Sequence, residues 1–148
     1  MEYDYKKVGN LNFITTEFDK HPSFKIYDAI QFFSKENDKD FKIFAIGAGN
    51  FFEEGSISQC YQKLEKVSEE LNLLFKDTKK SSPGKRTHYA DPTGESNFTG
   101  IYFNFESGGY ASVECFEWSE YMYEKYGNTN SFKISIATEE VRYFISQQ

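Results

Sequence analysis

Histidine and cysteine most often bind metals or act as nucleophiles, and this chain has only two of each. His21 and His88 lie far apart, and Cys60 and Cys115 form no Cys-x-x-Cys motif. A metal site needs several such ligands at suitable spacing, and a cysteine nucleophile needs a base beside it. We therefore expect no metal and no other cofactor. We expect both cysteines to be buried free thiols that behave as small hydrophobic residues.

A glycine pair at Gly47-Ala48-Gly49-Asn50 follows the apolar run FKIFAI at 41–46. Phosphate-binding loops carry a third glycine at fixed spacing or a Gly-Lys-Ser/Thr sequence, and neither is present here. Glu53 and Glu54 follow shortly after and would repel a phosphate. The pair therefore predicts a turn or a strand bulge instead of a nucleotide site.

The segment 106–126 combines carboxylates with aromatic rings. Tyrosine and tryptophan are enriched in interface hot spots, and carboxylates around them would suit lysine and arginine on a partner. Alternatively, several of these rings belong to the core and the glutamates only keep the outer face soluble. The candidate partner-binding residues are Glu114, Glu117, Trp118, Glu120, Tyr121 and Tyr123.

The stretch 76–97 is a long polar loop by composition, and its first half is basic within an acidic protein. Loops of this length are uncommon and are usually functional or disordered. Two interpretations compete: a mobile tether, or a contact loop that becomes ordered on binding. The loop could also pair with an acidic patch of the same chain. Lys85 and Arg86 are therefore secondary candidates for partner contacts.

In the first half of the chain, strands are predicted at 11–18 and 41–46. A helix is predicted between them from Ser23, because Ile26, Tyr27, Ile30 and Phe33 recur at helical spacing. The strongest helical pattern spans 56–75, where apolar residues recur every three or four positions.

In the second half, alternation predicts a hairpin at 98–116 that turns at Ser107-Gly108-Gly109. Beyond Phe116 the alternation fails, and either a helical turn or an irregular segment fits as far as Gly127. A strand at 132–136 and a terminal helix capped by Thr138 follow. This order predicts a single α+β domain over residues 1–148, with a mixed or antiparallel sheet and helices packed on one face.

Composition limits the functional classes. The chain has 148 residues, 19% aromatic content and a formal charge of −6. An acidic surface argues against a nucleic-acid partner. No apolar run is long enough to span a membrane, and the first residues lack the apolar stretch of a signal peptide. We therefore expect a cytoplasmic protein, and the oligomeric state is not predicted.

Residues near the C-terminus resemble a known group of proteins. Glu117-Trp118-Ser119, Met122, Lys125-Tyr126-Gly127 and the run KISIATEE at 133–140 are similar to the C-terminal part of small bacterial immunity proteins. These are the antidotes of contact-dependent growth inhibition and other polymorphic toxin systems. The resemblance implies a non-enzymatic protein in the producer's cytoplasm that blocks a cognate toxin domain. Many such toxins are nucleases with basic clefts, which would suit an acidic inhibitor.

Three functional hypotheses follow. The first is an immunity protein that neutralises a toxin domain, such as a nuclease, by occluding its active site. The alternative is a small enzyme or ligand-binding α+β domain with a pocket between sheet and helix. A third is an adaptor module without a toxin partner.

Overall fold

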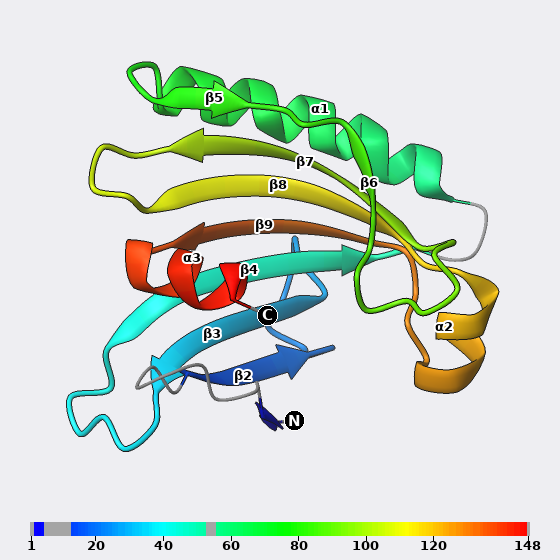
Figure 1. Ribbon diagram of the computed structural model, residues 1–148, viewed down its shortest axis with the longest axis horizontal. Helices are drawn as coiled ribbons and strands as arrows, with labels where there is room; N and C mark the ends of the chain where they lie inside the picture. The colour runs from blue at the N-terminus through cyan, green and yellow to red at the C-terminus, as the bar shows by residue number, and fades with distance from the viewer. Residues whose placement is uncertain (1, 5–12, 53–55, 148) are drawn as a thin grey trace.

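The computed structural model describes residues 2–4, 13–52 and 56–147, which form one large sheet with three helices (Figure 1). The strands in these ranges are β1 (Glu2–Asp4), β2 (Phe13–Asp19), β3 (Ala29–Lys35), β4 (Ile43–Phe51), β5 (Lys79–Ser81), β6 (Lys85–Thr87), β7 (Asn97–Asn104), β8 (Tyr110–Glu117) and β9 (Ser131–Ala137). The helices are α1 (Ile57–Leu74), α2 (Glu120–Tyr126) and α3 (Glu139–Ser146).

The strand order is β1-β2-β3-β4-β9-β8-β7-β5, and β6 also pairs with β7. Every pair of neighbouring strands is antiparallel. The predicted α+β class is therefore confirmed, and of the two predicted sheet types the antiparallel one is present. Among the described residues, no helix is long and apolar enough to cross a membrane.

The segment predicted as a helix from Ser23 contains β3 instead. This strand pairs with β2 on one side and with β4 on the other. Ile30, Phe32 and Phe33 are β-branched or aromatic, types that favour a pleated and half-buried surface. Ile26 lies before the strand and is 69% exposed. The residues that recur at helical spacing in this segment therefore do not form one buried face.

The glycine pair lies inside β4 and forms no turn. Gly47 is paired with Ser135, and Gly49 with Lys133. A Cβ atom built on Gly49 would lie 2.9 Å from the carbonyl oxygen of Phe132, so a glycine suits the close approach of β9. The irregularity of this strand pair comes earlier, where the register shifts between Phe33 and Ser34 of β3.

Helices cover both faces of the sheet rather than one. On one face, α1 packs through Cys60 and Leu64 against Val113 of β8 and Phe132 of β9. On the other face, Val141 and Phe144 of α3 pack into a second buried cluster. Its other members are Phe13, Phe33, Phe44, Ala45 and Ala137. The two clusters are separate because successive side chains of a strand point to opposite faces.

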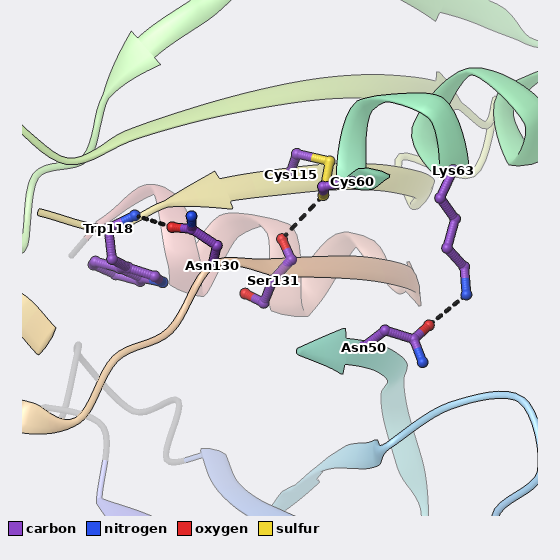
Figure 2. The surroundings of a disulfide bond; sticks show 7 residues. All are labelled: Asn50, Cys60, Lys63, Cys115, Trp118, Asn130 and Ser131. Atoms are coloured by element: carbon purple, nitrogen blue, oxygen red, sulfur yellow. Dashed lines mark hydrogen bonds between the residues drawn. A yellow bond between two sulfur atoms is a disulfide. The ribbon is translucent and has the colours of Figure 1, made fainter. Parts of the chain in front are cut away.

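Cys60 and Cys115 form a disulfide between α1 and β8, with a Cα–Cα distance of 5.9 Å (Figure 2). Both residues are at most 1% exposed. The predicted burial is confirmed, and the prediction of free thiols is wrong. The Cys60 sulfur also lies 3.4 Å from the carbonyl oxygen of Ser131. A disulfide sulfur carries no hydrogen, so this approach is a contact and not a hydrogen bond.

The polar stretch 76–97 is structured, unlike the loop predicted there. Its two short strands, β5 and β6, pair with β7 along different parts of its length. The mobile-tether interpretation therefore does not describe this segment. A turn at 88–96 completes it and leads directly into β7.

Candidate partner-binding site

The short helix α2 begins and ends with standard capping residues. The Ser119 side chain accepts a hydrogen bond from the backbone N–H of Met122, and Gly127 closes the helix with a φ of 72°. Serine is favoured at the first position and glycine at the last for these reasons. Met122 is buried and fixes the helix to the body of the protein. The helical alternative for this segment is thus the one present.

A pocket of about 300 Å³ lies between α2 and the segment that leads into β9. Trp118, Glu120 and Tyr123, three of the predicted partner-binding residues, line it. Its other lining residues are Phe52, Ser119, Glu124, Asn128, Thr129 and Asn130. Of these, the sequence pattern indicated neither Phe52, which comes from a distant part of the chain, nor Asn130, which lies outside the acidic and aromatic segment.

Asn130 holds the backbone at one side of this pocket in place. Its side-chain oxygen accepts a hydrogen bond of 2.9 Å from the backbone N–H of Trp118 (Figure 2). Its carbonyl oxygen accepts a second, of 2.8 Å, from the backbone N–H of Phe52. One residue thus joins the end of β4, the end of β8 and the start of β9.

Trp118 packs into a group of aromatic rings. Its ring centroid lies 4.5 Å from that of His88 and 6.2 Å from that of Phe116, with the Trp118 and Phe116 planes nearly parallel. Burial lowers the pKa of His88, and the nearby Asp91 charge only partly opposes this effect. The imidazole is therefore a neutral aromatic neighbour of Trp118 at pH 7.

Asp91 connects the turn at 88–96 to the start of α2. It is buried, and its two oxygens accept hydrogen bonds from the backbone and hydroxyl groups of Thr93 and Ser96. The Ser96 hydroxyl oxygen in turn accepts a 2.9 Å bond from the backbone N–H of Ser119. Burial alone would raise the pKa of Asp91, but these hydrogen bonds outweigh it and hold the pKa well below its usual range.

The pocket edge is acidic. Glu120 and Glu124 lie one helical turn apart and both are exposed. Lys125, on the same helix, donates a 2.7 Å hydrogen bond to the Tyr121 hydroxyl and lies 5.0 Å from the Tyr126 ring centroid. Tyr121 is thereby engaged with its own helix and does not line the pocket.

Glu117 is not free for a partner, because Lys85 binds it at 2.5 Å. This ion pair joins two residues predicted separately as contacts, and it matches the predicted alternative in which the basic stretch pairs within the chain. Arg86 follows on β6, opposite Phe98 of β7, and is exposed. Partly exposed ion pairs of this kind contribute little to stability.

Glu114 lies on the sheet face away from α1. It accepts a 2.6 Å hydrogen bond from the Tyr102 hydroxyl and a longer one from Ser112. Burial, together with the Glu114 charge, strongly raises the pKa of Tyr102. The structure therefore does not bring Glu114 to the α2 pocket.

Within the described ranges, no group of three or more His, Cys, Asp and Glu residues could hold a metal ion. The site offers instead aromatic surface, carboxylates and fixed amide groups. Comparisons of the chain with protein-family models, with curated proteins and with solved structures found no significant match.

Proposed function

We propose that this protein is an immunity protein that binds a cognate toxin domain, such as a nuclease, and occludes its active site. The observation that carries the proposal is the α2 pocket, where Trp118, Tyr123 and Phe52 line a hollow whose edge holds Glu120 and Glu124. Aromatic rings in a recess surrounded by charge are typical of binding hot spots. The resemblance to immunity proteins covers part of the same segment.

Charge supports a basic partner. The chain has a net charge of −6, and complementary charge accelerates encounter and selects against wrong partners. A toxin that binds nucleic acid needs a basic cleft, because it must neutralise phosphates. An acidic inhibitor placed over such a cleft would compete with the substrate. In this proposal the protein itself performs no catalysis.

The disulfide bears on the proposed compartment. The sequence predicts the cytoplasm, yet disulfides persist mainly in oxidising compartments. We propose that the oxidised form acts where thiols are not kept reduced. Both cysteines are buried, so the test is denaturation of freshly lysed native cells in the presence of an excess of alkylating reagent, followed by mass spectrometry. Alkylated Cys60 and Cys115 would restore the cytoplasmic assignment, and a protected pair would support an oxidising compartment.

The functional test is co-expression with a toxin-like domain, sought first among the genes that neighbour this one. We expect the wild-type protein to rescue growth and the double variant Glu120→Lys with Glu124→Lys to lose rescue, with toxin affinity reduced about 10–100-fold. The matched control, Glu65→Lys with Glu69→Lys, makes the same charge change at exposed positions of α1 with the same spacing. Equal cell death with and without the wild-type protein would reject the proposal for that toxin.

A second candidate, a domain that binds a small apolar ligand, has one observation in its favour. A hollow of about 320 Å³ lies between α1 and the sheet, and Tyr27, Leu71, Phe75, Ile46 and Ile134 are among its mainly apolar lining residues. Leu71→Trp would fill it. If an environment-sensitive apolar dye binds wild type and this variant equally, this candidate fails.

A further inference from the structure

The α2 pocket has two kinds of wall. Aromatic rings of Phe52, Trp118 and Tyr123 contribute to its lining, together with the carboxylate-bearing residues Glu120 and Glu124. A cation near the face of an aromatic ring is attracted by the ring's electron density, and a carboxylate attracts it further. The pocket therefore has the chemistry of a socket for one positively charged side chain.

The carboxylates at this edge are not neutralised by an ion pair within the described chain. The two ion pairs found there are Lys35–Glu140 and Lys85–Glu117. Lys125, the cation of α2 itself, bonds to Tyr121. A partner cation would thus meet two charges that face solvent and would displace no cation bound to them in this part of the structure.

The pocket is also held in shape before any partner arrives. Asn130 fixes the backbone of Trp118 on one side. On the other, the chain of hydrogen bonds from Asp91 through Ser96 reaches the backbone of Ser119, the capping residue of α2. A preformed recess loses less conformational entropy on binding than one that must be assembled.

We propose that the α2 pocket binds the guanidinium group of an arginine on the partner protein. This rests on the proposed function, in which the toxin domain supplies that arginine. A guanidinium is planar, stacks on aromatic rings and can donate two parallel hydrogen bonds to a carboxylate. A lysine ammonium is a compact and strongly hydrated charge. It has no planar surface to stack on a ring and cannot form the two parallel hydrogen bonds. An arginine side chain can therefore stack on the aromatic rings and bind the carboxylates at the same time.

The experiment uses Trp118 as its reporter, because it is the only tryptophan of the chain. The probes are the N-acetyl methylamides of arginine, lysine and citrulline, titrated at low salt, where charge is least screened. Citrulline is nearly isosteric with arginine but neutral. We expect the arginine probe to change Trp118 fluorescence saturably and to bind roughly tenfold more tightly than citrulline. Equal responses to arginine and citrulline would overturn the proposal.

Variants separate the pocket from general charge. Glu120→Gln with Glu124→Gln should weaken the arginine probe to the citrulline level, whereas Glu65→Gln with Glu69→Gln should leave it unchanged. Loss of binding in both double variants would show a general field effect and reject the socket. If the protein rescues cells from the toxin but does not prefer the arginine probe, the proposed function stands and the arginine site is rejected. If it prefers the arginine probe but does not rescue cells, the site stands and the proposed function is rejected.

Discussion

Helices α1 and α2 are both attached to β8, but by different kinds of interaction. α1 is bound by a disulfide and an apolar stripe that includes Cys60, Leu64 and Val67. α2 continues from the end of β8 and is held by Met122, its two caps and the polar network of Asp91. Covalent and apolar attachment needs no exact orientation of polar groups, whereas a hydrogen-bonded network does.

This difference assigns different roles to the two helices. The α1 region buries Cys60 and Leu64 against the sheet. The α2 region leaves Trp118, Glu120 and Tyr123 accessible around a recess while fixing their backbone. Rigid scaffold on one side and positioned, exposed side chains on the other is the arrangement expected of a binding protein.

The largest expected effect is loss of the disulfide. It closes a segment with a sequence separation of 55 residues, for which the chain-entropy model gives about 4 kcal/mol. Reduction, or Cys60→Ala with Cys115→Ala, should therefore lower the urea midpoint strongly. Because α2 is held by other contacts, the arginine-probe response of the still-folded protein should persist. An unchanged midpoint after complete reduction would show that the bond does not stabilise α1.

The second expected effect concerns Asp91. Asp91→Asn replaces one acceptor oxygen with an NH₂ group that faces hydrogen-bond donors of Thr93 or Ser96. We expect a smaller loss of stability than for the disulfide, together with a shift in Trp118 emission. Asp77→Asn, at an exposed position, is the matched control. A normal emission spectrum in Asp91→Asn would mean that the network does not position the pocket.

The same variant has a defined pH dependence. The folded-state pKa of Asp91 is lowered by its hydrogen bonds, although burial alone would raise it. Its stabilising effect is thus fully present above the unfolded pKa, near 3.9, and is lost as the pH falls below it. The difference in unfolding free energy between wild type and Asp91→Asn should be largest at neutral pH and shrink below about pH 4. A constant difference across this range would contradict the assignment.

Local sequence patterns were sufficient to predict an element when the pattern lies entirely within that element. The apolar period of α1, the Ser107-Gly108-Gly109 turn and the residues of α3 placed these elements correctly. They were not sufficient for β3, because Ile30 and Phe33 satisfy helical spacing and strand propensity alike. Pairing with β2 and β4 decides that segment, and pairing is a non-local property.

The same limit applies to the site. Composition alone indicated Trp118, Glu120 and Tyr123, since carboxylates and rings concentrate in their segment. It could not identify Asn130, whose role depends on the meeting of three strand ends. Nor could it show that Glu117 is paired with Lys85, or that Cys60 faces Cys115, because both pairings join residues far apart in the sequence.

The smallest expected effect tests how His88 supports Trp118. Burial lowers the pKa of His88, despite the opposing charge of Asp91. The folded protein therefore binds fewer protons at His88 than the unfolded chain does. The contribution of neutral His88 to the unfolding free energy is fully present above about pH 6.5 and is lost as the pH falls from there through the folded-state pKa. An imidazolium 4.5 Å from the indole, centroid to centroid, should also quench Trp118.

We therefore expect Trp118 fluorescence to fall on acidification with a midpoint below about pH 6.5, the ordinary histidine value. His88→Gln should abolish this transition, and His21→Gln, at an exposed position outside the site, should retain it. A midpoint at or above the ordinary value would mean that burial against Trp118 does not outweigh the Asp91 charge at His88. Packing of the turn at 88–96 would then hold α2 less firmly than the apolar stripe holds α1.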